Sequence, residues 1–323
     1  MDHHLIRNIF NKDDVGRAWT LIQQAQAITL LTHDKPDGDG VSACAAVSLL
    51  LEKLGKKTET IYPSKPEFEI KRQSKHVLIN KHSFVPDLII ACDTANYGRL
   101  YFPDDFKSIQ LINIDHHISN KIKGTINFVS EYGVASSCEQ VYHLVLGWNA
   151  DALDKQMAEI LLFGLLYDSQ VFYTKATNSN TLKIAAELID KGANLFSLQA
   201  ELLQNKDPQI IALWGHVLSN VCFSKTKKSA WVVITQKELQ QRGLDLASLV
   251  GLSNFLAQLS QTDVTALFYE DKDGRTKVSF RSKKADVNAF AAQFGGGGHT
   301  NASGIWVDEP IVVVVKKVTA LFV

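Results

Sequence analysis

Acidic and histidine side chains follow three of the short apolar runs in the first half of the sequence, and one more acid interrupts an apolar helical pattern. They are His33, Asp37, Asp39, Asp93, Asp115, His116, His117 and Asp168. Carboxylates gathered in one place repel each other and destabilise a fold unless cations neutralise them. Carboxylate and imidazole ligands without thiolate favour a hard, octahedral ion such as Mn²⁺ or Mg²⁺ over structural zinc, and the imidazoles favour Mn²⁺.

So many candidate ligands predict two metal ions. In two-ion enzymes the ions lie about 3.5–4 Å apart, share a carboxylate, activate a water and clamp a phosphoryl group. Each residue alone also has an ordinary interpretation, because “HDKPDGD” is typical of a turn, and Asp93 or Asp168 fits a strand-end cap or a solvated helix residue. Their joint occurrence favours the metal site. A second “DHH”, at residues 2–4, precedes no predicted strand, and we assign it no function.

The first half of the chain alternates strand and helix patterns. The predicted strands span 27–33, 58–63, 87–93 and 109–117, and the predicted helices span 40–55, 136–148, 155–169 and 179–192. The strands are almost continuously apolar, which is typical of parallel strands covered on both faces. We therefore expect an α/β domain with a mainly parallel sheet flanked by helices. Because the carboxyl ends of parallel strands lie at one edge, the candidate ligands should meet there.

The second half of the chain predicts a smaller domain. Residues 193–220 are helical and more polar, with a break at Pro208, and form a predicted linker. Residues 230–236 and 264–282 are predicted antiparallel strands, the latter a hairpin that turns at Asp273-Gly274, and Asp286 caps a short helix before “GGGGHTNASG”. We predict two α/β domains with a cleft between them: a larger one over 1–192 and a smaller one, with a mixed sheet, over 221–323.

Composition limits the classes of partner. Of 323 residues, 46% are hydrophobic and 21% are charged, as in a soluble globular protein long enough for two domains. Thirty-four basic and 34 acidic residues cancel, so no stable complex with long nucleic acid is expected, whereas a local groove for a short anion stays open. We find neither a secretory signal nor an apolar run of roughly 20 residues, so we expect a cytoplasmic protein without membrane contact.

Cysteine usage agrees with that compartment. Cys44, Cys92, Cys138 and Cys222 are far apart and include no CxxC pair. The first three lie in apolar segments, which predicts buried free thiols in a reducing compartment.

Apolar residues on the predicted helices fit either the core or a homodimer interface, and both alternatives stay open.

Five motifs, in order, carry a resemblance that covers nearly the whole chain. They are “HDKPDGDG”, “CDT”, “DHH”, “GLLYDS” and “GGGGHTNASG”. In this order the chain resembles the DHH phosphoesterase superfamily, and within it the bacterial oligoribonuclease/pAp-phosphatase (NrnA-like) group, whose last motif belongs to a DHH-associated C-terminal domain. Two departures concern fine substrate preference: “GDGVSA” stands where relatives have “GDALGS”, and Ser169-Gln170 stands where they often have Thr-Gly.

The resemblance implies a role for each residue of the first domain. One ion would be held by His33 and Asp37, the other by Asp39, His116 and Asp168, with Asp93 bridging the two. The two other residues of the “DHH” motif would be catalytic: His117 would face the substrate phosphate, and Asp115 would support His116 or His117. A basic residue near the position of Arg99 is common in relatives, but a role for Arg99 stays open.

In the second domain, the resemblance implies that Arg281, Gly296, Gly297, Gly298 and His299 bind substrate. Arginine can hold phosphate with two parallel hydrogen bonds, and glycine backbone can bring N–H groups close to an anion. The alternative for the four glycines is a flexible linker.

The resemblance implies a hydrolase that uses two Mn²⁺ ions, with Mg²⁺ or Co²⁺ as substitutes, to cleave short nucleotide substrates. Candidates are 3′-phosphoadenosine 5′-phosphate (pAp), dinucleotides such as pApA or pGpG, and short oligoribonucleotides. Alternatives are a RecJ-type single-strand DNA exonuclease, an inorganic pyrophosphatase and a non-catalytic nucleotide sensor. The physiological substrate, the direction of degradation, the oligomeric state and the native metal stay open.

Overall fold

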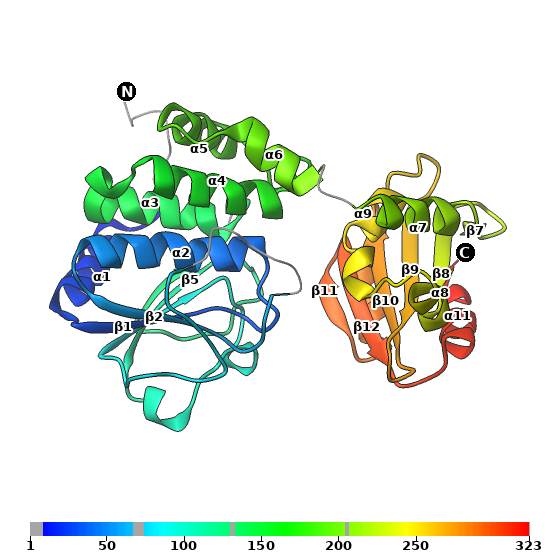
Figure 1. Cartoon of the computed structure of the whole chain (residues 1–323), viewed down its shortest axis with the longest axis horizontal. Helices are drawn as coiled ribbons and strands as arrows, with labels where there is room; N and C mark the ends of the chain where they lie inside the picture. Colours follow the sequence, from blue (N-terminus) through cyan, green and yellow to red (C-terminus); the bar gives the residue numbers. More distant parts are fainter. Residues whose placement is uncertain (1–8, 67–73, 130–132, 204–206, 323) are drawn as a thin grey trace. The chain divides into compact units, whose positions relative to one another are not determined.

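The computed structural model describes residues 9–66, 74–129, 133–203 and 207–322, so the second “DHH” string at residues 2–4 lies outside it. The chain divides into two compact units, Met1–Asn205 and Lys206–Val323 (Figure 1). Each unit is built on a six-stranded sheet of its own. The α/β fold class predicted for both halves is therefore confirmed.

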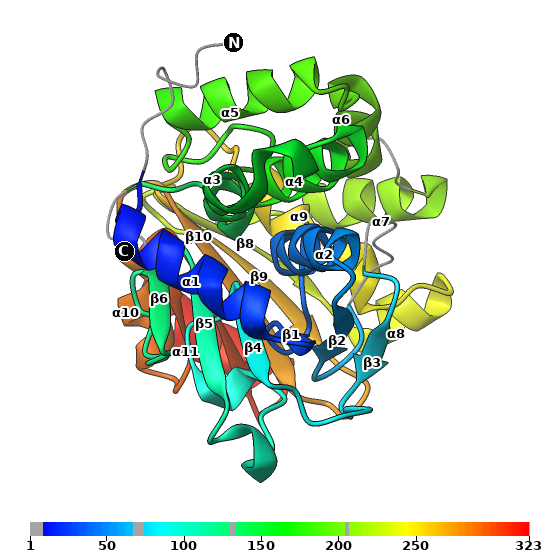
Figure 2. The ribbon, with the colours of Figure 1, turned by 90° about the vertical axis from the view of Figure 1, so that its left-hand side faces the viewer.

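The sheet of the first unit is parallel throughout. Its strands are β1 (Ala27–Leu31), β2 (Lys57–Tyr62), β3 (Val77–Ile79), β4 (Leu88–Cys92), β5 (Gln110–Asp115) and β6 (Ile126–Val129). The spatial order is β3-β2-β1-β4-β5-β6, and Figure 2 shows the strands side by side in this order. The sequence analysis missed β3 and β6, which have only three and four residues and carry little periodicity.

Helices of the first unit stack in layers on one face of this sheet (Figure 1). They are α1 (Lys12–Gln24), α2 (Gly38–Lys53), α3 (Ser137–Asn149), α4 (Lys155–Asp168), α5 (Ser179–Asp190) and α6 (Leu195–Leu203). Helix α2 packs on the strands, α3 and α4 pack on α2, and α5 and α6 pack on α4. The sequence analysis missed α1, which buries only Ala18 and Ile22.

Both faces of the first sheet are buried, which explains the continuously apolar strands. Leu30 of β1 and Ile90 of β4 join the core that includes the helices. Their neighbours Leu31 and Ile89 point the other way and pack in a second cluster with Phe106, in the connection between β4 and β5. This connection contains two short 3₁₀ helices, η2 (Tyr97–Arg99) and η3 (Asp104–Phe106).

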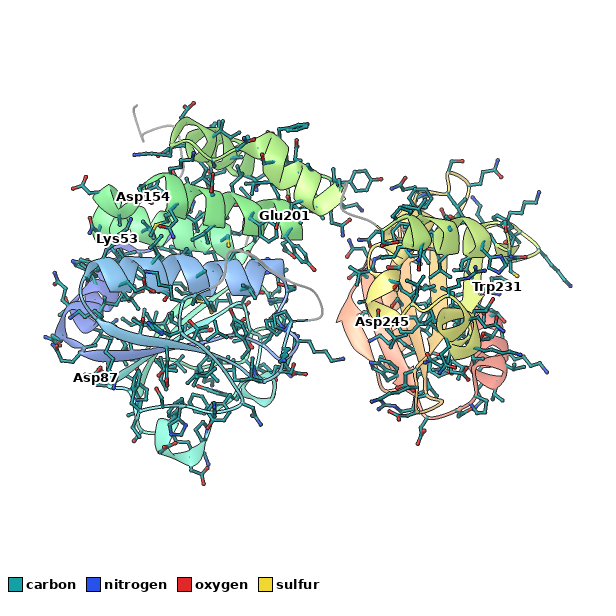
Figure 3. All side chains as sticks on the ribbon, in the orientation of Figure 1. Lys53, Asp87, Asp154, Glu201, Trp231 and Asp245 are labelled. Carbon is teal, nitrogen blue, oxygen red and sulfur yellow. The ribbon has the colours of Figure 1, made fainter. Side chains whose placement is uncertain are left out.

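Side-chain caps and one ion pair hold the helices at defined starting points. Asp37 caps α2 by accepting hydrogen bonds from the backbone N–H groups of Asp39 and Gly40. Asp154 caps α4, and its carboxylate also pairs with Lys53 near the end of α2, at 2.7 Å (Figure 3). The cap at Asp37 fixes the start of α2 in the segment that follows β1, where the first candidate ligands lie.

The second unit has a mixed sheet with helices on both faces. Its strands are β7 (Cys222–Phe223), β8 (Ser229–Ile234), β9 (Val264–Glu270), β10 (Thr276–Ser282), β11 (Gly297–His299) and β12 (Ala302–Val307), in the order β11-β12-β10-β9-β8-β7. The helices are α7 (Pro208–Leu218), α8 (Gln236–Gln241), α9 (Leu252–Leu256), α10 (Val287–Ala292) and α11 (Ile311–Thr319). Helices α10 and α11 cover one face, and α7, α8 and α9 cover the other.

One strand pairing differs from the prediction. We expected antiparallel strands, and the hairpin β9–β10 is antiparallel, but β8 and β9 are parallel. A crossover with α8, η5 (Leu246–Leu249) and α9 connects β8 to β9. A connection of this length lets the chain return to the same end of the sheet, and strand periodicity alone carries no information on direction.

Two expectations drawn from composition can be compared with the structure. Cys44, Cys92 and Cys138 are buried free thiols, as predicted, and Cys222 is free and exposed. Within the residues that the structure describes, no helix combines the length and the apolar character needed to cross a membrane.

Candidate active site

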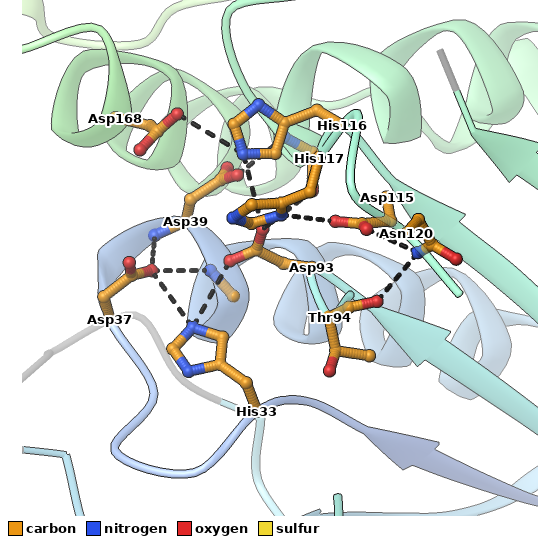
Figure 4. Close-up of polar contacts among 12 residues, drawn as sticks. His33, Asp37, Asp39, Asp93, Thr94, Asp115, His116, His117, Asn120 and Asp168 are labelled. Atoms are coloured by element: carbon orange, nitrogen blue, oxygen red, sulfur yellow. Dashed lines mark hydrogen bonds and ion pairs between the residues drawn. The ribbon is translucent and has the colours of Figure 1, made fainter. Parts of the chain in front are cut away.

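The candidate ligands meet at the carboxyl edge of the first sheet (Figure 4). His33 follows β1, Asp93 follows β4, and the “DHH” motif ends β5. Asp37 and Asp39 lie at the start of α2, and Asp168 is the last residue of α4. Three parallel strands and two helix ends thus bring to one place residues that are up to 135 positions apart, as the sequence analysis predicted.

One group of donor atoms consists of His33, Asp37 and Asp93. Nε2 of His33 lies 3.8 Å from Oδ1 of Asp37 and 3.5 Å from Oδ2 of Asp93. Nδ1 of the same ring lies 2.8 Å from the carbonyl oxygen of Asp34. Because Nδ1 is engaged on this side, Nε2, which faces Asp37 and Asp93, is the nitrogen placed to bind a metal.

A second group consists of Asp39, His116 and Asp168. Nε2 of His116 lies 3.5 Å from Oδ2 of Asp168 and 3.6 Å from Oδ1 of Asp93. Within each group, one donor atom per residue lies within 4.8 Å of the others. The two oxygens of Asp93 thus face different groups, which is the position that a bridging carboxylate needs.

The space between these donors fits a cation. A Cβ atom added to Gly40 would lie 2.6 Å from Oγ1 of Thr32 and 3.1 Å from Oδ2 of Asp93, so glycine keeps this space open. Oγ1 of Thr32 is buried and has no hydrogen-bond partner in the described part of the chain. Oxygen and imidazole nitrogen donors around such a space suit a divalent metal ion.

Groups at the start of α3 hold two of the acids in place. The sequence analysis predicted this helix but not these contacts. Asp39 accepts hydrogen bonds from the backbone N–H groups of Ser137, at 2.6 Å, and Cys138, at 3.0 Å. The hydroxyl of Ser137 donates to Oδ1 of Asp93 at 3.1 Å. The signal in the sequence was a helix start, because Ser136 caps α3 and precedes an apolar pattern.

Asp115 orients His117 rather than His116, which decides between the two partners that the sequence analysis left open. Oδ1 of Asp115 lies 2.7 Å from Nδ1 of His117, and Asp115 itself is fully buried. Asn120, which the sequence analysis did not name, donates to Oδ2 of Asp115 at 2.5 Å and to the carbonyl oxygen of Thr94 at 2.9 Å. A chain of hydrogen bonds from Asn120 through Asp115 therefore fixes the orientation of the His117 ring.

Buried acids raise the pKa of two histidines in the metal-free protein. Burial lowers the pKa of His33, but its hydrogen bonds to Asp37 and Asp93 outweigh this and bring it to about 10. Burial likewise lowers the pKa of His117, but the hydrogen bond to Asp115 and the charge of Asp93 bring it to about 9. Protons on these rings neutralise part of the acid cluster when no metal is bound.

The pKa values of the acids shift in different directions according to their surroundings. Burial raises the pKa of Asp93, but the hydrogen bond and charge of His33 hold it below the usual range. Burial and the charge of Asp93 raise the pKa of Asp39 well above its usual value. Burial raises the pKa of Asp168 to about 6, although the charge of His116 opposes this. A cation would relieve the repulsion between these three carboxylates.

Asp168 is followed by a left-handed turn that begins at the Ser169-Gln170 pair. Gln170, Val171 and Phe172 have φ angles of 50°, 59° and 67°. The buried Ser169 holds the turn, since its hydroxyl accepts from the N–H of Phe172 at 3.0 Å and its carbonyl from the N–H of Tyr173 at 2.8 Å. The turn packs Val171 and Phe172 against the core, so this chain forms it without glycine.

Arg99 lies beside the first donor group. One nitrogen of its guanidinium lies 2.8 Å from Nδ1 of His33 and donates to the carbonyl oxygen of Asp34 at 3.3 Å. The backbone N–H of Asp34 donates to the carbonyl oxygen of Arg99 at 2.7 Å. The open question about Arg99 therefore gains a structural answer: it contacts a candidate metal ligand.

In the second unit, Arg281 is partly buried and has neutral partners. Its Nε donates to Oδ1 of Asn254 at 2.6 Å, and its Nη1 donates to the carbonyl oxygen of Phe280 at 2.8 Å. Burial lowers the pKa of Arg281. No carboxylate among the described residues forms an ion pair with it. A guanidinium placed in this way is available to an anionic ligand, and Asn254 was not foreseen from the sequence.

Strand register brings the other predicted substrate residues of this unit together. Ala302 of β12 pairs with Arg281 on one side and with His299 of β11 on the other, so the three lie in one row across the sheet. Gly297 and Gly298 belong to β11, which excludes a flexible linker at these two positions. Gly296 also approaches β12 closely, because an added Cβ atom would collide with the carbonyl oxygen of Gly304. Their contact with substrate stays a prediction.

Two family models match the chain, one in each unit. The model of the DHH family, N-terminal domain, matches residues 27–165, and the model of the DHHA1 domain matches residues 232–319. The first range contains every candidate ligand of the first unit except Asp168, and the second contains Arg281 and the glycine string.

Relatives of known activity match over most of their length. The bifunctional oligoribonuclease and PAP phosphatase NrnA of Bacillus subtilis (strain 168) is 29% identical over 290 residues, which cover 86% of this chain and 88% of the relative. The protein of the same name from Thermus thermophilus is also 29% identical over 290 residues, covering 86% and 83%.

Solved structures share the fold. An exopolyphosphatase-related protein from Bacteroides fragilis superposes with a TM-score of 0.89 at 23% identity and covers 98% of both chains. Exonuclease RecJ bound to manganese superposes with a TM-score of 0.56 at 14% identity, covering 98% of this chain and 96% of RecJ. The two family models in order and the NrnA relatives show that the chain belongs to the DHH phosphoesterase superfamily, in its NrnA-like group, and hydrolyses phosphoester bonds.

Proposed function

We propose that the protein hydrolyses phosphoester bonds of short nucleotides with the help of two divalent metal ions at the carboxyl edge of the first sheet. The observation that carries this proposal is the placement of Asp93, whose two oxygens face two separate donor groups. When bound, two divalent ions supply positive charge to a phosphate and lower the pKa of an attacking water. Mn²⁺ is the proposed ion, with Mg²⁺ or Co²⁺ as substitutes, because imidazole accompanies the carboxylates.

The residues of the chain divide this work. His33 and Asp37 would hold one ion and Asp39, His116 and Asp168 the other. The backbone N–H groups at the start of α3 fix both oxygens of Asp39, so this ligand is oriented before metal arrives. Gly40 leaves the space between Thr32 and Asp93 free.

His117 is the proposed group that contacts the substrate phosphate. Asp115 orients its ring through Nδ1, and the side chain is partly exposed beside the donor groups. A proton on Nε2 can donate to a phosphoryl oxygen or to the oxygen that leaves. Arg281 would hold a second phosphate with the fork of its guanidinium, with the N–H groups of the glycine string and His299 beside it.

Short nucleotides are the proposed substrates: pAp, dinucleotides such as pApA and pGpG, and short oligoribonucleotides. The names of the NrnA relatives support this class, and these relatives match over more than four fifths of their length. The balance of 34 basic and 34 acidic residues supports short over long nucleic acids. The buried free thiols support a reducing, cytoplasmic location.

A release assay on chelator-stripped protein tests the function. We expect release of phosphate from pAp and of mononucleotides from pApA only after Mn²⁺ is added, and loss of both activities in Asp93→Ala. A labelled 20-mer of single-stranded DNA serves as a competing substrate. Preferred cleavage of the 20-mer would support the RecJ-type alternative, and tight binding of pAp without turnover in Mn²⁺ would support a sensor.

A further inference from the structure

A hollow lies beside η2, on the face of the first sheet that α2 does not cover. Its volume is about 710 Å³, and Leu100 and Leu111 form part of its wall. Both residues belong to the hydrophobic cluster on that face. Pockets that bind small ligands have volumes of about 300–1,000 Å³. The hollow is thus large enough for a mononucleotide.

Aromatic rings form one side of this hollow. The rings of Tyr97 and Phe102 both line it, and their centroids lie 5.0 Å apart. Tyr97 keeps 38% of its surface exposed, although its hydroxyl donates to the carbonyl oxygen of Lys123 at 3.3 Å. A ring held in place and yet exposed offers a flat apolar surface to a planar ligand.

Positive charge lies on another side of the hollow. Lys107 and Lys123 line it, and none of the lining residues is acidic. Lys123 has no ion-pair partner in the described ranges of the chain. Lys107 pairs with Asp104 at 2.6 Å, but their side chains are 67% and 93% exposed, so water weakens this pair. A ligand with negative charge would therefore meet the ammonium group of Lys123 and would compete with Asp104 for that of Lys107.

Helix η2 connects this hollow to the metal centre. Tyr97 and Gly98 line the hollow, and the next residue, Arg99, lies 2.8 Å from Nδ1 of His33. Since η2 is only three residues long, a ligand that moves Tyr97 also moves Arg99. The guanidinium of Arg99 would then carry the change to His33.

We propose that this hollow is a second binding site, for a small aromatic anion of mononucleotide size, and that η2 couples it to the metal centre. The site is separate from the donor groups around Asp93, and its coupling to the metal centre rests on the proposed function. Binding there would change the metal affinity of the centre, and by thermodynamic linkage metal would change the affinity for the ligand by the same factor.

Calorimetric titration of the full chain with AMP, in saturating Mn²⁺, tests the site. Lys123→Glu reverses a charge of the hollow, and Thr125→Trp fills it, whereas Lys121→Glu changes an exposed lysine of the same segment that does not line it. We expect the wild type and Lys121→Glu to bind one more AMP than Lys123→Glu and Thr125→Trp. Equal stoichiometry in all four proteins would overturn the site, and thermal unfolding checks that each variant is folded.

Two further arms test the ligand class and the coupling. In a competition titration, inorganic phosphate should show an affinity at least about tenfold lower than that of AMP, because it lacks the ring. Equal affinities would overturn the aromatic part of the proposal. AMP should change the affinity for Mn²⁺ by about fivefold in the wild type and in Lys121→Glu but not in Lys123→Glu. An unchanged affinity in the wild type would overturn the coupling through η2.

Discussion

The two units bury charge of opposite sign. In the first unit, Asp39, Asp93 and Asp115 are almost completely buried, and the cations beside them are histidines, which can lose their charge. In the second unit, Arg281 is partly buried against an amide and a carbonyl group. Because buried charge is costly without a partner, the first unit is suited to cations and the second to an anion.

This difference separates two tasks that a phosphoesterase must combine. The acids of the first unit form a centre for the chemistry of the phosphate, and the row with Arg281 offers a grip on a ligand. Arg275 directly precedes β10 and differs from Arg281 in its partner. Its side chain donates two hydrogen bonds to the carboxylate of Asp271, whereas Arg281 has neutral partners. Substitutions can therefore test whether the tasks are divided between the units in this way.

The largest effect is expected from Asp93→Asn, which keeps the shape of the side chain and removes its charge. Turnover should fall at least about 1,000-fold, because both donor groups lose the carboxylate they share. Affinity for Mn²⁺, measured by calorimetry, should fall as well. Asp104→Asn, which changes an exposed acid of the same unit, is the control. Unchanged Mn²⁺ affinity in Asp93→Asn would contradict the assignment of metal binding to the first unit.

Arg281→Ala should act on substrate and spare the metal. We expect KM to rise about 10- to 100-fold, since a charged hydrogen-bond donor is lost, while the affinity for Mn²⁺ stays unchanged. Asn254→Ala, which only releases Nε of Arg281, should raise KM about three- to tenfold.

Arg275→Ala is the matched control for Arg281, because its guanidinium already has an acid partner. Steady-state kinetics on pAp should show an unchanged KM in this variant. If Arg281→Ala weakened Mn²⁺ binding as strongly as it weakened substrate binding, the division of tasks between the units would be wrong.

Acid should remove the stabilising contribution of His143 in the first unit at a higher pH than that of Asp271 in the second. Burial lowers the pKa of His143 to about 4, so between pH 7 and pH 5 the unfolded chain takes up a proton that the folded unit does not. With an unfolded pKa of about 6.5, this costs about 2 kcal/mol at pH 5. Asp271 behaves differently: burial raises its pKa, but hydrogen bonds from Arg275 lower it further, so its stabilising effect is lost only below about pH 4.

Urea unfolding of the wild type and of His143→Gln at pH 7 and pH 5 measures this effect. The difference in unfolding free energy between the two proteins should shift by about 2 kcal/mol in favour of the variant at pH 5. A shift of zero would mean that His143 is protonated in the folded unit.

A smaller effect on metal binding is expected from Ser137→Ala than from Asp93→Asn. The variant loses the hydrogen bond to Asp93 and keeps the backbone bonds to Asp39, so affinity for Mn²⁺ should fall about tenfold. Ser48→Ala removes another buried hydroxyl of the same unit and should leave the affinity unchanged. Equal losses in both variants would show that a general change in packing, and not the contact with Asp93, is responsible.

Sequence reasoning located the candidate ligands because each follows a recognisable strand or helix pattern. Asp93 and the “DHH” motif end continuous apolar runs, and a parallel sheet brings such ends to one edge. Ser137, Asn120 and Asn254 escaped it because they act through single hydrogen bonds to residues that no local pattern identifies. The direction of β8 escaped it because alternation of side chains is the same in parallel and antiparallel strands.

The contact between Asp39 and the start of α3 also bears on how the protein matures. Ser137 lies 98 positions after Asp39, and Asp168 lies later still, so the centre joins segments that are synthesised far apart. Contacts of such sequence separation slow folding, because a long loop must be closed before they form. A chain emerging from the ribosome therefore cannot assemble the whole donor set until the end of α4 has been made, so full metal uptake requires every element of the first unit from β1 to α4.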